Sequence, residues 1–388
     1  MKTDFGRIYV MMGTACNFNC VYCSQSTSQQ GIQKTECRPH ISKRPSKEFL
    51  DYMKRYGEAL DVTNLKRKPT IAFWGGEPLL YFDTIKQIID VLGENISKFR
   101  LGTVTNGELI TDEMVDFFNK NHVVVNLSHD GPKTVVTRGK DVLKSSIIRD
   151  RFHALNSVTF HTVISGVTQD LYRNWDYFAE MGFPENENTS YMQMMVYPYD
   201  GIPDYLLKFD LVKWEETLQK VVASLYKSFL ENNGEVNVRS KEFQVITHQL
   251  GSLYRSNYEH FKATGEVHYC QTATKMLAVD VQGKTYFCHN SSKEILPVYD
   301  PNFDSLYAGL AEDMVCKTMK DSRDYCRDCE YGYFCTTSCP LPHDKSKAQT
   351  LCGAVKLLCE YVRRYFHLTE AYRGNIVLPD SIKVPRHA

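Results

Sequence analysis

Three cysteines near the start of the chain have the types and spacing that most clearly point to chemistry. Cys16, Cys20 and Cys23 are separated by three and then two residues, so three thiolates stand on one short loop. A [4Fe–4S] cube needs a ligand on every iron, whereas a structural zinc ion needs four donors. The loop therefore predicts a cube whose fourth iron takes another ligand. The alternatives are a zinc-binding loop or unrelated thiols.

A second group of cysteines lies in the last part of the chain. One stretch there contains the spacings x2, x5 and x3, and only one Cys-x2-Cys pair, whereas a double zinc ribbon would show two such pairs. The isolated Cys37 lacks a partner at metal spacing and is predicted to be a bystander thiol, and Cys359 fits the core face of a helix. The other C-terminal cysteines are candidate metal ligands: Cys270, Cys288, Cys316, Cys326, Cys329, Cys335, Cys339 and Cys352.

The elements that must position the first cysteines can be predicted from hydrophobic patterning. Short apolar runs alternate with helical patterns, and Ser46 is a plausible N-cap for the first helix. Alternation of this kind predicts an α/β fold in which helices cover a parallel sheet, with functional residues at the C-terminal ends of the strands. The predicted strands are residues 8–12, 70–74, 101–105, 123–127, 160–164 and 192–197, and residues 210–229 are predicted to form a last helix over the barrel.

Polar motifs follow three of these predicted strands. Each would pass alone for an ordinary turn. Their order after the cysteine loop makes them candidate cofactor-binding residues: Gly75, Gly76, Glu77 and Pro78; Thr105 and Asn106; Ser128 and Asp130.

The cysteine spacing, with Tyr22 directly before Cys23, and these motifs in this order resemble the radical S-adenosylmethionine (SAM) superfamily. The resemblance implies a partial (β/α)6 TIM-like barrel. It also implies that SAM binds the open iron and is cleaved by electron transfer to methionine and a 5′-deoxyadenosyl radical. The Gly-Gly-Glu-Pro motif would hold the amino group of SAM. Its ribose and carboxylate would meet Thr105, Asn106, Ser128 and Asp130.

The C-terminal cysteines resemble the SPASM extension, a loop-rich iron–sulfur domain of peptide-modifying members. The resemblance implies two auxiliary [4Fe–4S] clusters and three cubes in total. Cys316 either completes the inner cluster or leaves it open to substrate. The implied domains are residues 1–230, a bridge at 231–269 and residues 270–388. The inner cluster would take Cys270, Cys288 and Cys339, and the outer cluster Cys326, Cys329, Cys335 and Cys352.

Two histidines are candidate catalytic bases. His289 directly follows Cys288, at a position where sulfatase-maturing relatives carry a catalytic aspartate. His129 stands beside the SAM motif, where the family more often has a hydrophobic residue. A buried structural role is the alternative for His289.

The leading interpretation is oxidative modification of a ribosomally synthesised peptide, by a carbon–sulfur or carbon–carbon crosslink. The alternatives are formylglycine formation on a protein Cys or Ser and a non-enzymatic metal-stabilised binding module. A reductant such as flavodoxin or ferredoxin is the expected partner. Substrate contacts are expected from residues 193–199, from the loop at 25–40 and from the bridge.

Composition narrows the partners. The chain has 388 residues, with 46 Lys plus Arg against 46 Asp plus Glu, so no global field attracts nucleic acid or an anionic membrane. It shows neither a secretory pattern nor an apolar run of about 20 residues, the length of a membrane span. The sequence therefore predicts a cytoplasmic protein without nucleic-acid or membrane partners, in which the cysteines stay reduced and bind metal.

Overall fold

An eight-stranded sheet organises the computed structural model, which describes residues 5–23, 44–65, 67–199, 201–247, 276–286, 288–291, 293–307, 309–310, 329–331 and 345–375. The strand order is β6-β5-β4-β3-β2-β1-β7-β8, and every neighbouring pair is parallel except β7 with β8. The strands are β1 (Arg7–Met11), β2 (Thr70–Trp74), β3 (Arg100–Thr105), β4 (Val123–Ser128), β5 (Val158–Ile164), β6 (Thr189–Met195), β7 (Met276–Asp280) and β8 (Thr285–Tyr286).

All six predicted strands form, and β2 has the predicted bounds. The predicted α/β fold with a largely parallel sheet is confirmed. The sheet also extends past β1 with β7, where Arg7 pairs with Met276 and Met11 with Asp280. This strand brings a late segment of the chain to the first strand of the barrel.

Helices separate the strands, and several begin at the capping residues that their sequences provide. The predicted cap of α2 is confirmed, because Ser46 Oγ accepts a hydrogen bond from Phe49 N at 3.1 Å. The α-helices are α2 (Lys47–Ala59), α3 (Phe82–Leu92), α4 (Asp112–Lys120), α5 (Thr134–Arg138), α6 (Ser146–His153), α7 (Leu171–Glu180), α8 (Asp204–Leu207), α9 (Leu211–Glu231) and α13 (Lys345–Tyr372). Short 3-10 turns are η1 (Pro78–Tyr81), η2 (Gly93–Lys98), η3 (Gly131–Lys133) and η4 (Val142–Lys144).

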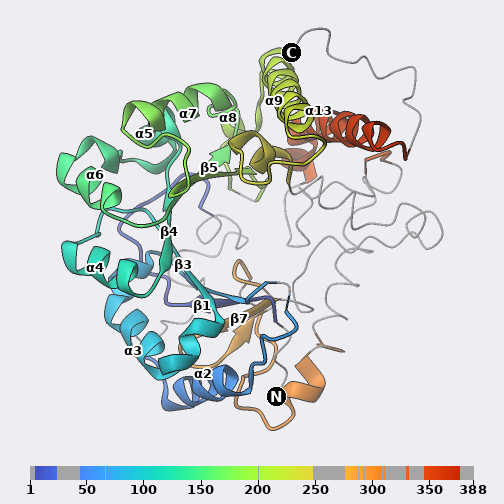
Figure 1. The fold of residues 1–388 in the computed structure, drawn as a ribbon. Helices are drawn as coiled ribbons and strands as arrows, with labels where there is room; N and C mark the ends of the chain where they lie inside the picture. The colour runs from blue at the N-terminus through green and yellow to red at the C-terminus, as the bar shows by residue number, and fades with distance from the viewer. Residues whose placement is uncertain are drawn as a thin grey trace.

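Alternate residues of each strand face the helices. In β4, β5 and β6 a fully buried side chain alternates with a half-buried one. Phe160 of β5 and Tyr191 of β6 belong to the buried set and pack on Phe178 of α7, with ring centroids 4.4 and 5.6 Å away. Helices α2 to α7 therefore line the outer side of a curved sheet (Figure 1), and the half-buried set, including Ser128, faces inward.

Helix α9 forms where the sequence predicts the last barrel-covering helix, and it packs against α13 from the far end of the chain. The two helices lie side by side (Figure 1), and Trp214 Nε1 donates a hydrogen bond to Ala354 O at 3.0 Å. Cys359 of α13 is 0% exposed and belongs to the hydrophobic core, as predicted.

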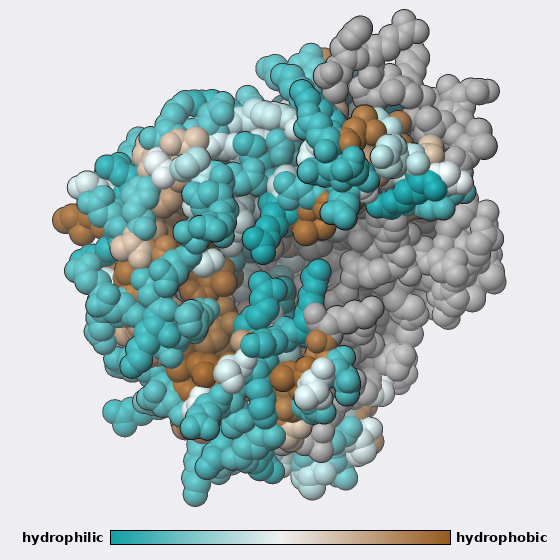
Figure 2. Space-filling model, viewed as in Figure 1, coloured by the Kyte–Doolittle hydropathy of each residue, from teal (hydrophilic) through white to brown (hydrophobic). Residues whose placement is uncertain are grey.

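Hydrophilic residues cover most of the described surface on the face shown in Figure 2, with hydrophobic patches interspersed between the outer helices. In the part of the chain that the structure describes, we find no helix with the length and apolar character needed to cross a bilayer.

Candidate active site

The loop with the three N-terminal cysteines begins where β1 ends, and the backbone of β2 holds its start. Met12 N donates to Trp74 O at 2.7 Å, Gly76 N to Gly13 O at 2.8 Å and Glu77 N to Ala15 O at 2.8 Å. The parallel pairing of β1 and β2 thus continues beyond both strands. We call residues 13–23 the cysteine loop.

The two glycines of the Gly-Gly-Glu-Pro motif allow this close approach. A Cβ atom on Gly75 would lie 2.7 Å from Gly13 O, and one on Gly76 would lie 2.2 Å from Ala15 O. Both distances are well inside van der Waals contact. The sequence makes the two glycines candidate cofactor-binding residues, and the structure shows that they leave room for the backbone of the cysteine loop itself.

The three cysteines share one loop and differ in their exposure. Cys16 is exposed and Cys20 and Cys23 are half-buried, and Cys20 lies close enough to the other two for their charges to interact. Among the residues that the structure describes, no three Cys, His, Asp or Glu side chains meet closely enough to hold a single metal ion. Three thiols on one loop can supply three of the four iron ligands of a [4Fe–4S] cube, whereas a structural zinc ion would need a fourth donor.

The protein environment acts on two of the thiols. Burial raises the pKa of Cys20 to about 11, and the positive charge of Arg138 opposes that shift. Burial also raises the pKa of Cys16, against the effect of Phe18 N, which donates to its Sγ at 3.4 Å. Asn106 Nδ2 lies 3.9 Å from Cys16 Sγ as a second donor. These two thiols therefore ionise less readily than a free cysteine.

Glu77 lies buried between the ends of β2 and β3. Its side chain is 1% exposed, and its carboxylate accepts bonds from Leu79 N at 3.0 Å, Thr105 Oγ1 at 2.6 Å and Asn106 N at 2.8 Å. Burial raises its pKa, and these three hydrogen bonds oppose the rise. Glu77 therefore joins two predicted motifs at one edge of the sheet.

Asn106 connects this edge to the cysteine loop. Its Nδ2 donates to Asn17 Oδ1 at 2.7 Å, and Asn17 Nδ2 donates to Glu108 Oε2 at 2.8 Å. The sequence analysis did not single out Asn17, although an amide directly after the first cysteine is the signal that could have found it.

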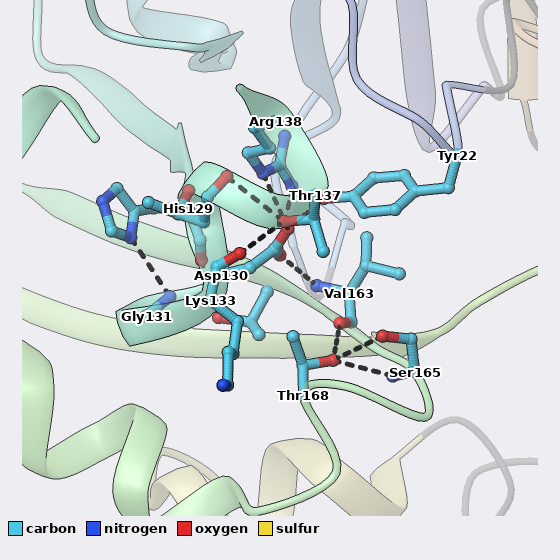
Figure 3. A network of polar contacts seen from close by, with 12 residues as sticks. Tyr22, His129, Asp130, Gly131, Lys133, Thr137, Arg138, Val163, Ser165 and Thr168 are labelled. Carbon is cyan, nitrogen blue, oxygen red and sulfur yellow. Dashed lines mark hydrogen bonds and ion pairs between the residues drawn. The ribbon is translucent and has the colours of Figure 1, made fainter. Parts of the chain in front are cut away.

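Asp130, just beyond β4, is the centre of a second polar network (Figure 3). It is 0% exposed, and one of its oxygens accepts from Val163 N at 2.9 Å while the other accepts from Thr137 Oγ1 at 2.6 Å. The Arg138 Nε atom donates to Asp130 at 3.0 Å, and the Tyr22 hydroxyl donates to it as well. The carboxylate predicted to contact SAM thus accepts hydrogen bonds from three separate segments of the protein. Ser128, two residues earlier, is half-buried on the inward side of β4.

His129 points to the helix layer rather than to the cysteine loop. Its ring is 1% exposed and stacks on Tyr177 of α7 at 5.5 Å. Nδ1 accepts from Gly131 N at 3.1 Å and Nε2 lies 3.0 Å from Asp141 Oδ1, so both ring nitrogens hold local structure. Burial lowers its pKa, against the hydrogen bond to Asp141. This geometry favours a positioning role over a catalytic base.

His289 is brought to the inner side of the barrel by the segment that follows β8. Its ring stacks on Tyr9 of β1 with centroids 4.2 Å apart, and it meets the ring of Trp74 edge-on at 4.6 Å. Trp74 directly precedes Gly75, so His289 lies beside the edge at which the cysteine loop is attached. The structure therefore brings together His289 and the Gly-Gly-Glu-Pro motif, which lie more than 200 residues apart in sequence.

Only part of the second cysteine group falls on described residues. Cys288, Cys329 and Cys352 are half-buried, and Cys352 lies on α13. Five predicted ligands lie outside the described residues: Cys270, Cys316, Cys326, Cys335 and Cys339. Cys37, the whole loop at 25–40 and much of the bridge also lie outside them.

Arg138 and Thr137 are site residues that the sequence analysis missed. Both lie in α5, directly after the Ser128-to-Asp130 motif, and both bind Asp130. A basic residue in a short helix after a polar strand end is a weak signal. Only the folded chain shows that it meets the cysteine loop.

The comparisons with known proteins agree with this geometry. Residues 10–201 match the model of the radical SAM superfamily. The chain is 25% identical over 343 residues to the radical SAM cyclopropyl synthase TigE of Paramaledivibacter caminithermalis, covering 86% of this chain and 67% of TigE. It is 21% identical over 384 residues to a cysteine-type anaerobic sulfatase-maturating enzyme of Clostridium perfringens, covering 91% of this chain and 93% of that enzyme.

Solved structures with the same fold include native anSMEcpe with bound AdoMet. That structure has a TM-score of 0.64 and 18% identity, and the match covers 94% of this chain and 99% of that one. Streptococcus suis SuiB bound to its precursor peptide SuiA matches with a TM-score of 0.53 and 13% identity, over 90% of this chain and 77% of that one.

Proposed function

Because this chain belongs to the radical SAM superfamily, we propose that it oxidatively modifies a ribosomally synthesised peptide, forming a carbon–sulfur or carbon–carbon crosslink. The chain is an enzyme of that superfamily, which removes the interpretation of its cysteines as a non-catalytic binding module. The question that remains is which substrate it takes and which bond it makes.

The residues at the strand edge would hold the cofactors. Cys16, Cys20 and Cys23 would ligate a [4Fe–4S] cluster, and Gly75, Gly76, Glu77, Pro78, Thr105, Asn106, Ser128 and Asp130 would surround SAM. The bound pair would supply a 5′-deoxyadenosyl radical that abstracts a hydrogen atom from carbon. The protein's part is then to place that carbon, exclude water and accept a proton.

His289 is the observation that carries the proposal of an oxidation. Formation of a crosslink removes two hydrogens from the peptide. One would leave as a hydrogen atom to the 5′-deoxyadenosyl radical. The other would leave as a proton to a base, and its electron would pass to an acceptor. The ring of His289 stands on the inner side of the barrel between Tyr9 and Trp74, next to the attachment of the cysteine loop. An imidazole with an ordinary pKa near 6.5 can accept a proton near neutral pH.

We propose that the electron leaves through auxiliary clusters. Cys270, Cys288 and Cys339, with Cys316 or an open position, would hold the inner one, and Cys326, Cys329, Cys335 and Cys352 the outer one. Cys288 directly precedes His289, so the inner cluster would lie beside the proposed proton acceptor. Flavodoxin or ferredoxin would supply the first electron.

The names of the relatives support a peptide substrate and a new carbon bond. SuiB is bound to a precursor peptide. TigE is named a cyclopropyl synthase, and forming a cyclopropyl ring requires a new carbon–carbon bond. The sulfatase-maturating relative supports the second candidate, formylglycine formation on a Cys or Ser. That candidate is disfavoured because His289 stands where the sulfatase-maturing relatives carry aspartate.

The first test compares the iron content and SAM cleavage of cysteine variants. Reconstitution under anaerobic conditions should give about twelve irons per chain for three cubes. Replacing Cys16, Cys20 and Cys23 with Ala should remove about four irons and all SAM cleavage, whereas Cys359→Ala, in the core, should keep both. Cleavage of SAM by the triple variant would contradict the assignment of the loop.

The test of the reaction uses the small peptide encoded beside the gene, with SAM and dithionite under anaerobic conditions. We expect a mass loss of about two units per crosslink and a stretch that no longer fragments in tandem mass spectrometry. His289→Gln should still form 5′-deoxyadenosine but little crosslinked peptide. Formylglycine in a sulfatase-derived peptide would establish the second candidate instead, and full product formation by His289→Gln would make His289 structural.

A further inference from the structure

Tyr22 is attached to the barrel by its hydroxyl and by its neighbour's backbone. It stands between Cys20 and Cys23, and its hydroxyl donates to Asp130 (Figure 3). The preceding residue, Val21, donates its N–H to Thr137 O at 2.9 Å. The turn that carries the last two cysteines is thus fixed at two points to the segment after β4.

The carboxylate that receives Tyr22 is neutralised inside the protein. Asp130 is 0% exposed, and Arg138 is 8% exposed and donates Nε to one oxygen at 3.0 Å and Nη2 to the other at 3.4 Å. Removing one member of a buried ion pair is costly because the other charge stays behind. The position of the guanidinium is therefore strongly determined.

Arg138 also contacts Tyr22 directly. Its Cζ atom lies 5.2 Å from the centroid of the Tyr22 ring, a cation–π distance. Tyr22 is therefore held by its hydroxyl through Asp130 and by its ring through Arg138. The arrangement keeps a buried cation beside the segment from Cys20 to Cys23, and the interaction of Cys20 with Arg138 is stronger than its interaction with Asp130.

We infer that Tyr22, Asp130 and Arg138 form a clamp that fixes the turn from Cys20 to Cys23 and directs the positive end of the Asp130–Arg138 ion pair towards that turn, which favours reduction of its cluster. The inference rests on the proposed function, in that these cysteines hold a cluster. Reduction adds negative charge, which a nearby cation stabilises, and cluster potentials depend on net charge and surroundings. The three residues are positioning residues, since they act through the loop.

Two variants separate the parts of the clamp. Tyr22→Phe removes only the hydroxyl, so we expect iron from the cysteine loop to be lost to a chelator about tenfold faster, with an unchanged potential. The pair Asp130→Asn with Arg138→Met removes both charges without leaving one buried alone. It should lower the ratio of reduced to oxidised cluster about tenfold at a fixed applied potential, about 59 mV for one electron.

The readout is the electron paramagnetic resonance signal that changes when SAM is added, because only a cluster with an open iron binds SAM. The single variant Arg138→Lys keeps the positive charge and should keep most of the wild-type reduced fraction. Arg151→Met, which removes a surface cation elsewhere, should leave the reduced fraction unchanged. A wild-type potential in the charge-free pair, or wild-type iron retention in Tyr22→Phe, would overturn the clamp. A wild-type protein whose signal ignores SAM would overturn the proposed function itself.

Discussion

Glu77 and Asp130 are two buried carboxylates just beyond β2 and β4, the strands on either side of β3, and their partners differ in charge. Asp130 is paired with Arg138 and accepts further bonds from Thr137, Tyr22 and Val163. Glu77 accepts from two backbone N–H groups and a hydroxyl, so the partners that the described residues offer it are neutral. Burial raises its pKa as a result.

The difference separates two roles that the sequence motifs alone present as one. Asp130 has its own cation, so its charge is balanced within the protein, and it anchors the cysteine loop through Tyr22. Glu77 has three hydrogen bonds but no cationic partner among the residues that the structure describes, so a cationic ligand would stabilise its charged form. The ammonium of SAM is the ligand that we propose for this edge of the sheet.

The largest expected effect tests the ion pair. Asp130→Asn keeps the shape of the side chain but leaves the buried guanidinium of Arg138 without its carboxylate. We expect a loss of about 3–5 kcal/mol in the free energy of unfolding, measured by chemical denaturation. Asp112→Asn, at the exposed ion pair with Arg151, is the control and should cost less than about 1 kcal/mol. A small effect of Asp130→Asn would remove the contrast between the two carboxylates.

The next prediction tests the close contact between Gly76, the residue before Glu77, and the backbone of the cysteine loop. In Gly76→Ala the new methyl group would be forced against Ala15 O. We expect a loss of about 3 kcal/mol, the upper part of the range for overpacking, together with loss of iron from the cysteine loop. Gly102→Ala is a matched control, since its nearest neighbour would lie 3.5 Å away, and its iron content should be unchanged. Retention of iron in Gly76→Ala would show that the loop tolerates displacement.

A smaller effect tests Glu77 itself. Glu77→Gln replaces an acceptor by a donor that faces the N–H of Asn106 or Leu79, so one buried group loses its partner. We expect a loss of about 1–3 kcal/mol in stability, less than for Asp130→Asn. If the ammonium of SAM meets this carboxylate, SAM affinity should also fall by about 1.5–3 kcal/mol in an equilibrium titration. Unchanged SAM affinity would make Glu77 purely structural.

The smallest effect concerns His129, which supports the turn at Asp130. Burial lowers its pKa in the folded protein, so the folded state resists a proton that the unfolded chain accepts near pH 6.5. Stability should therefore fall as pH drops below about 6.5, and the decline should be shallower in His129→Gln. Burial lowers the pKa of His367 as well, so the difference between the two proteins, followed by thermal unfolding, isolates His129. Equal pH profiles would show that the buried ring does not titrate with unfolding.

Local sequence determined much of the barrel and of its cofactor edge. Apolar runs of five or six residues and capping residues such as Ser46 act over short stretches of sequence, so the positions of β1 to β6 and the start of α2 could be predicted. The spacing of Cys16, Cys20 and Cys23 is also local, and parallel strands must bring their C-terminal ends to one edge of the sheet.

Tertiary structure alone determined where individual side chains point and which residues they contact. His129 and Asp130 are neighbours in sequence just beyond β4, yet one stacks on Tyr177 of the helix layer and the other binds Tyr22 and Arg138. His289 reaches Tyr9 and Trp74 because β7 pairs with β1, a contact between segments about 270 residues apart. Such a pairing depends on which strand edge remains open once the barrel has formed. No short-range pattern in the sequence encodes that choice.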